Sequence, residues 1–140
     1  MTFYDDPRFG AVHSMNLRGK AAQTSVRAAR VEADRRTMLR AVTIKDWNVF
    51  FVDGATTTGT ALATKFKMCI AKSVAGTGTV TPFGTAYCGT QANGTVQDGS
   101  VTETDLDAGD DLLLTYEAGT ALPAGAVQCE ADVSYVERYT

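Results

Sequence analysis

The sequence lacks the residues from which most enzymes build a catalytic or metal centre. It contains a single histidine, His13, and no CxxC spacing, GxSxG, P-loop or GxGxxG motif. A general base or a zinc ligand needs a rigid, partly enclosed setting, whereas His13 lies in an N-terminal stretch without periodicity. We therefore expect no enzymatic activity, no cofactor and no metal.

Long apolar runs are also missing. No stretch approaches eighteen consecutive apolar residues, and the N-terminus has no apolar segment of the signal-peptide kind, so we expect neither a membrane span nor Sec secretion. The odd number of cysteines (Cys69, Cys88 and Cys129) fits a reducing cytoplasm, with thiols buried as small hydrophobic groups. At 140 residues, of which 44% are hydrophobic and 21% charged, the chain fits one globular domain with its own core.

Basic residues are absent between Lys72 and Arg138. Residues 1–72 hold twelve of the thirteen Lys and Arg against six acids, whereas residues 73–140 hold Arg138 against ten acids. Two interpretations follow from this asymmetry. The two halves interleave in one fold and form complementary faces, or the basic surface of one copy meets the acidic surface of another copy or of a larger assembly.

The chain is patterned mainly as short β-strands. Residues 62–70, 112–116 and 127–139 alternate apolar and polar side chains, and Gly- and Thr-rich turns separate them. No strand–helix–strand alternation is present. We therefore predict an all-β fold, a single antiparallel β-sandwich or jelly-roll-like domain over residues 25–140.

Three local features refine this prediction. The apolar positions of residues 41–54 change phase across Lys45–Asp46, which predicts a bulge or corner there. Residues 25–40 suit either a helix or a strand; we favour a strand that enters a turn at Asp34-Arg35-Arg36. Asn93–Gly94 is suited to a two-residue hairpin turn.

The acidic stretch that begins at Asp105 allows two interpretations. An EF-hand loop would place glycine sixth and glutamate twelfth, but Asp110 and Tyr116 occupy those positions. An irregular calcium site at Asp105, Asp107 and Asp110 remains as an alternative. We favour a turn in which Ala108–Gly109 supplies permissive backbone and Asp110 bonds local amides before a strand begins.

Residues 1–24 show no sustained periodicity, yet they carry aromatic and apolar side chains that a disordered tail would normally lack. We predict an extended N-terminal arm that becomes ordered on another surface; a tail tucked against its own domain is the alternative. Five arginines could grip a nucleic-acid backbone, namely Arg27, Arg30, Arg35, Arg36 and Arg40. The net charge of −3 and the few interleaved aromatics favour instead a solvated face, or pairing with acidic groups of a neighbouring subunit. The predicted assembly interface comprises Phe3, Tyr4, Arg8, Phe9, Met15, Leu17, Arg18, Arg27, Arg30, Arg35 and Arg36.

Two thirds of the chain resemble the small β-sandwich proteins of tailed-phage virions. The similar pieces are AVTIKDWNVFFVDGATTTGTALATKFKM (41–68), the LDAGD turn (106–110) followed by DLLLTY, and AVQCEADVSYVERY (126–139). Among virion proteins of this size, the chain resembles the decoration or cement proteins. The resemblance implies a virion location on the capsid surface, a major capsid protein as partner, self-association as a homotrimer, and an N-terminal arm that reaches across capsid subunits. From the charge and the lack of long apolar runs we expect no nucleic-acid or membrane partner.

Two rival functions remain. Exposed Trp47 or Tyr87 beside polar loops would suit a carbohydrate- or receptor-binding module of a phage fibre or baseplate, although Trp47 and Phe51 of a sandwich more often lie in the core. A calcium-dependent adhesion domain is the third possibility.

Overall fold

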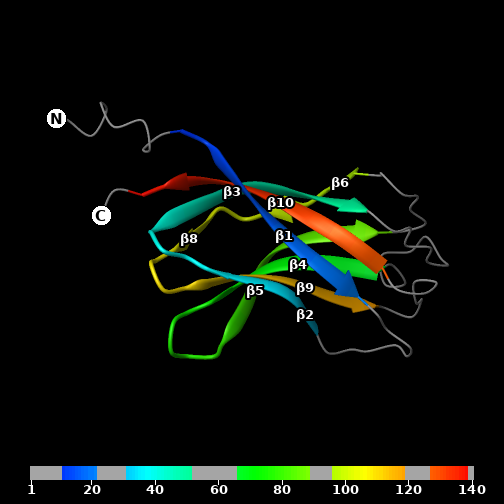
Figure 1. Ribbon diagram of the computed structural model, residues 1–140, viewed down its shortest axis with the longest axis horizontal. Coiled ribbons are helices and arrows are strands. Elements are labelled where there is room, and N and C mark those ends of the chain that lie inside the picture. Colours follow the sequence, from blue (N-terminus) through cyan, green and yellow to red (C-terminus); the bar gives the residue numbers. More distant parts are fainter. Residues whose placement is uncertain (1–10, 22–30, 52–65, 89–95, 119–126, 139–140) are drawn as a thin grey trace.

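The computed structural model describes residues 11–21, 31–51, 66–88, 96–118 and 127–138 (Figure 1). Within these residues the chain forms ten strands in two antiparallel sheets, and no helix. The two sheets pack face to face, which confirms the predicted all-β sandwich. No helix that is long and apolar enough to span a membrane occurs in this part of the chain.

The chain passes back and forth between the two sheets. The first sheet contains, in spatial order, β1 (His13–Ala21), β10 (Val127–Glu137) and β3 (Val42–Phe51), and β3 also pairs with β6 (Val96–Asp98) and β8 (Thr104–Leu106). The second contains β2 (Val31–Thr37), β9 (Asp111–Ala118), β4 (Phe66–Ser73), β5 (Val80–Cys88) and β7 (Ser100–Val101). Apart from the β4–β5 hairpin, consecutive strands lie in opposite sheets.

The core lies between the sheets and surrounds Trp47. The indole is 2% exposed, and its Nε1 donates a hydrogen bond of 2.8 Å to the carbonyl of Ser100 on β7. Ile44, Met68 and Leu114 pack in the same cluster of buried side chains. Trp47 is therefore a core residue, as its strand pattern predicted. It cannot serve as a sugar-stacking platform.

Gly99 leaves room for this indole, and replacing it with alanine is expected to destabilise the fold. A Cβ at Gly99 would overlap the Trp47 ring, which cannot swing away because β7 holds its N–H. We expect Gly99→Ala to lower the free energy of unfolding by about 1–3 kcal/mol through overpacking. Urea denaturation measures the loss. The matched control, Thr102→Ala at an exposed position of the same segment, should stay within about 0.5 kcal/mol of the parent; equal effects would contradict this packing.

The predicted irregularity in the third strand is present. Ser134 of β10 lies opposite Asp46, and the next residue, Tyr135, lies opposite Ile44, so Lys45 is the extra residue of a bulge. The bulge allows Ile44 and Trp47, which are separated by an odd number of positions, both to face the core. The sequence prediction across Lys45–Asp46 is therefore confirmed.

The predicted turn at Asp34-Arg35-Arg36 is wrong. β2 runs through these residues to Thr37 and pairs with β9, with a register shift between Glu32 and Asp34, and the chain turns at residues 38–41. β2 is the edge strand of its sheet, so its exposed positions tolerate consecutive charged residues that resemble a turn. The predicted hairpin turn at Asn93–Gly94 lies outside the described residues.

The prediction of an arm over all of residues 1–24 is also wrong for residues 13–21. These residues form β1, which pairs with β10 from His13–Tyr135 to Ala21–Val127. Its apolar face comprises Met15 and Leu17, a repeat too short to stand out as periodic. Residues 1–10 and 22–24 lie outside the described part of the chain.

Candidate functional site

Three turns meet at the end of the sandwich where β1 begins and β10 ends (Figure 1). They are residues 38–41, 74–79 and 107–110, and we call this region the braced end. Backbone hydrogen bonds of 2.8 Å join the first turn to the third, with Met38 N–H donating to Asp110 C=O and Gly109 N–H to Met38 C=O, and a further bond runs from Arg138 N–H to Ala41 C=O. The Ala75 N–H of the second turn donates to the Asp110 side chain. The turns therefore hold one another in fixed positions.

The Asp110 carboxylate is the centre of this bracing. It is buried, and it accepts hydrogen bonds from the backbone amides of Ala75 (3.1 Å) and Asp107 (2.9 Å). It also forms an ion pair with the Lys72 ammonium at 3.1 Å. Burial by itself would raise the pKa of Asp110, but the two amides and the Lys72 ammonium outweigh it and lower the pKa below its ordinary value. Gly109 has φ +95°, the backbone conformation that the turn requires. The predicted Asp-rich turn is confirmed.

The aspartates of this turn face cations of the protein itself. The Arg138 guanidinium lies 2.6 Å from an Asp107 oxygen and 3.7 Å from an Asp105 oxygen, while Asp110 is paired with Lys72. Across the described residues no group of three potential metal-ligating side chains converges. The structure thus offers no support for the alternative of a calcium site at these positions.

The uneven charge distribution is balanced to a large extent within the fold. Five ion pairs join a cation of residues 1–72 to an acid of residues 73–140: Arg18–Glu130, Arg35–Asp111, Arg40–Glu137, Lys45–Glu103 and Lys72–Asp110. Most of these pairs are exposed and individually weak, but their arrangement favours complementary faces of one domain. The asymmetry therefore gives no separate evidence for a charged partner.

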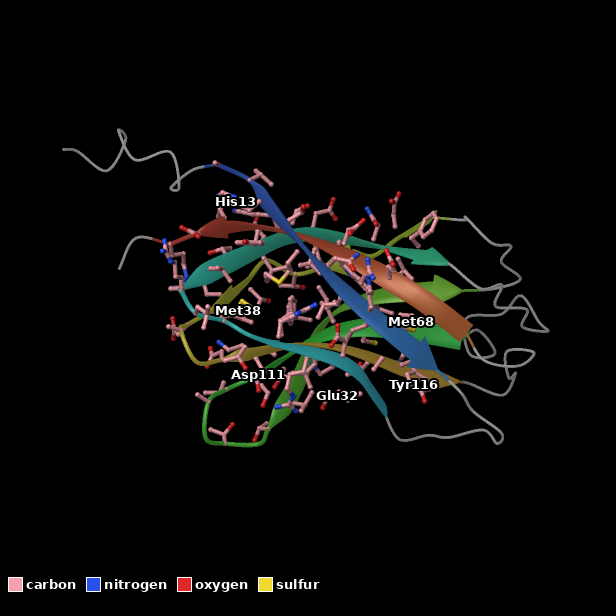
Figure 2. The ribbon with its side chains drawn as sticks, viewed as in Figure 1. His13, Glu32, Met38, Met68, Asp111 and Tyr116 are labelled. Atoms are coloured by element: carbon pink, nitrogen blue, oxygen red, sulfur yellow. The ribbon has the colours of Figure 1, made fainter. Side chains whose placement is uncertain are left out.

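A pocket of about 320 Å³ lies at the braced end, between β1, the turn that follows β2, and the end of β10. Two thioethers and an aromatic ring form much of its wall. Its lining comprises Met15, Arg36, Thr37, Met38, Leu39, Arg40, Val42, Tyr135 and Glu137, and we call it the Met pocket. Figure 2 shows Met38 and His13 at this same end of the sandwich.

Two apolar side chains in this part of the molecule are strongly exposed. Leu39, in the lining of the Met pocket, is 91% exposed, and Val12, which directly precedes β1, is 69% exposed. The His13 ring lies 5.6 Å from the ring of Tyr135, so the start of β1 is packed against the pocket wall. An exposed leucine in the lining of a pocket with thioether and aromatic walls is suited to an apolar contact with a partner.

The structure separates the predicted interface residues into different environments. Met15 and Arg36 line the Met pocket, and Arg36 donates to the carbonyl of Asn16 (3.3 Å). Leu17 is fully buried in the core and thus differs from its predicted place in an interface. Arg18 and Arg35 pair with acids of their own chain. The other predicted residues, Phe3, Tyr4, Arg8, Phe9, Arg27 and Arg30, lie outside the described residues.

The sequence prediction missed the second wall of the pocket. Met38 and Leu39 form an apolar pair between Arg36 and Arg40, and this interruption of a charged run was the available signal. Tyr135, on the last strand, is partly buried against the core. Cys69 is buried, as predicted. The structure does not describe the side chains of four other residues named in the sequence analysis: Phe51, Tyr87, Cys88 and Cys129.

Comparison with known proteins adds little to this picture. No protein-family model matches the chain, and no curated protein matches it. Among solved structures, the chain is similar to VP17, a capsid protein of bacteriophage P23-77, with 9% identity, a TM-score of 0.24, and coverage of 93% of this chain and 99% of that chain. A similarity of this strength carries no argument about function.

Proposed function

We propose that this protein is a virion structural protein, specifically a decoration or cement protein that binds the outside of a phage head and bridges major capsid subunits. The observation that carries the proposal is the Met pocket at the braced end, whose lining includes the strongly exposed side chain of Leu39. The sequence resemblance to small sandwich proteins of tailed-phage virions supports the same function.

The physical requirements of such a protein match the fold. A cement protein needs a rigid body and a contact surface whose parts keep their spacing. Asp110 and the backbone bonds around it fix the turns that carry Leu39 and the pocket wall. Because these groups are fixed before binding, little conformational entropy would be lost when a partner covers them.

Attachment through several copies would strengthen a modest contact. In the proposed homotrimer, each copy would present the same braced end, and simultaneous engagement raises the overall affinity without any new contact. The proposed partners are the major capsid protein and further copies of this chain, and the proposed location is the capsid surface.

Solution mass, measured by size exclusion with light scattering, tests the oligomer. We expect a stable species near three times the 14.9 kDa mass of the chain. A species that remains monomeric at every concentration, together with specific binding on a glycan array, would contradict the proposal and favour its rival.

The rival is a carbohydrate- or receptor-binding module of a phage fibre or baseplate. It has an observation in its favour, a groove of about 370 Å³ lined by residues 82–85 and 100–102, in which threonine and serine hydroxyls lie beside Phe83. A partly buried aromatic side chain next to hydroxyls suits a sugar. Glycan-array binding that is lost on Phe83→Ala would support the rival.

A further inference from the structure

We propose that the Met pocket is the docking site for a segment of this same chain, Phe3-Tyr4-Asp5-Asp6, close to the N-terminus. The inference concerns the free protein; a capsid partner that covers the Met pocket would displace the segment. It rests on three properties of the pocket: the chemistry of its walls, the charge of its rim, and its position beside the first strand.

The walls of the pocket suit an aromatic side chain. Met15 and Met38 contribute thioethers and Tyr135 contributes a ring. Sulfur–aromatic contacts are favourable, and aromatic pairs gain energy beyond the area that they bury. A volume of about 320 Å³ lies at the lower end of the range of ligand pockets, about 300–1,000 Å³, so the pocket suits one or two side chains rather than a large ligand.

The rim of the pocket suits an acidic residue directly after the aromatic one. The lining contains two arginines, Arg36 and Arg40, and one acid, Glu137, so cations outnumber acids. Arg36 donates a hydrogen bond to the Asn16 carbonyl, and Arg40 pairs with Glu137. Arg40 lies 3.6 Å from a Glu137 oxygen that is buried and has no hydrogen-bond partner among the described residues, and more than half of the Arg40 side chain is exposed. The segment Phe3-Tyr4-Asp5-Asp6 places two aromatic rings beside two carboxylates. It therefore complements both the walls and the rim.

The segment is also within reach of the pocket. Residues 7–10, Pro-Arg-Phe-Gly, separate it from Ala11, and Met15 of the pocket lies in the strand that follows. Four extended residues span up to about 13 Å, and proline and glycine favour a change of direction. A short connection of this kind gives a millimolar effective concentration, so docking within one chain outcompetes docking between separate copies in dilute solution.

Methionine methyl NMR on the full-length protein tests the proposal. Met15 and Met38 line the pocket, whereas Met68 is fully buried in the core and lies away from the braced end (Figure 2), so it reports on the fold itself. In the double variant Phe3→Ser/Tyr4→Ser we expect the Met15 and Met38 methyl resonances to shift, because ring currents are lost, and the Met68 resonance to stay. The control Phe9→Ser should leave all three resonances in place.

The outcomes are distinct. Met15 and Met38 resonances that do not move in the double variant, or that move equally in Phe9→Ser, would overturn the proposal. Resonances that change on dilution of the unmodified protein, but not on dilution of the double variant, would overturn docking within one chain and indicate docking between copies. Because residues 3 and 4 lie outside the described strands, an unchanged Met68 resonance shows that the variant remains folded.

Proteolysis gives a second readout. Trypsin cleaves after Arg8, and the cleavage rate follows the fraction of molecules with an undocked segment. Leu39→Ser, at an exposed position of the pocket rim, removes an apolar contact with the docked segment. We expect it to accelerate this cleavage about fivefold or more, the change that a loss of about 1 kcal/mol produces. The matched control Val80→Ser, an exposed apolar residue that is not part of the pocket lining, should cleave at the parent rate; equal rates in parent, Leu39→Ser and control would contradict docking.

Discussion

Replacing Trp47 with alanine is expected to lower the free energy of unfolding by about 3–5 kcal/mol, the usual cost of deleting a large buried aromatic side chain. The indole is 2% exposed between the two sheets. The substitution leaves a cavity in the core and removes the donor that the Ser100 carbonyl accepts at 2.8 Å. Urea denaturation at neutral pH, with far-UV circular dichroism as the probe, measures the loss.

Two further variants separate the causes of this loss. Trp47→Phe keeps most of the apolar volume and removes the N–H, so we expect a clearly smaller loss than for alanine. Lys45→Ala lies on the same strand, but its ion pair with Glu103 is largely exposed, and we expect a change of no more than about 1 kcal/mol. A Trp47→Ala protein within about 1 kcal/mol of the parent would show that the indole is not the centre of the core.

Replacing Asp110 with alanine is expected to cost about 3 kcal/mol, as breaking a buried ion pair usually does. The change leaves the Lys72 ammonium without its carboxylate and the amides of Ala75 and Asp107 without their acceptor. It also loosens the turn that is bonded to Met38 at the wall of the pocket. Equilibrium urea denaturation of both proteins measures the difference in free energy of unfolding.

The Asp110 contribution depends on pH in a defined direction. The pKa of Asp110 is lower in the folded protein than the ordinary value of 3.8, so folding favours the charged form. The stabilisation is therefore fully present above the unfolded pKa and is lost as the pH falls through the folded pKa. The difference between parent and Asp110→Ala should be largest near neutrality and should shrink below about pH 4.

The exposed Glu103 provides the charge-matched control. Glu103→Ala removes an acid that forms a surface ion pair with Lys45, and it should change stability by no more than about 1 kcal/mol at neutral pH. An Asp110→Ala deficit that stayed constant from neutral to acid pH would contradict the assigned role of the carboxylate.

Features that arise from local chemistry could be predicted from the sequence. The phase change at Lys45–Asp46 indicated a bulge because a period of two leaves no other way to keep both ends of a strand buried. The turn before β9 was predictable because Asp110 bonds amides close to it in the chain and Gly109 supplies the positive φ. In both cases the information lies within a few residues.

Features that arise from edge strands could not be predicted in the same way. In β1, Met15 and Leu17 make a repeat of two apolar residues, which is too short to distinguish from an irregular segment. In β2, Asp34 is half-buried and Arg35 is exposed on an edge strand. Charged residues are common in edge strands as well as in turns, so their presence does not distinguish the two. Pairing with β10 and β9, which lie far along the chain, decides both structures.

The Met pocket was accessible to sequence analysis only in part. Met15 was predicted as an interface residue, but its partners Met38 and Tyr135 come from a turn and from the last strand. No short-range pattern in the sequence predicts that residues 38–41 contact residues 107–110. Their contact through Met38 and Asp110 is a long-range result of the sandwich topology.

The most direct test of the central proposal is sedimentation with capsid shells assembled from the major capsid protein of the same virus. The account predicts that the protein pellets with the shells to a saturating, stoichiometric level and raises the temperature at which the shells disassemble. Protein that stays in the supernatant at every concentration, and shells whose thermal stability is unchanged, would contradict the account.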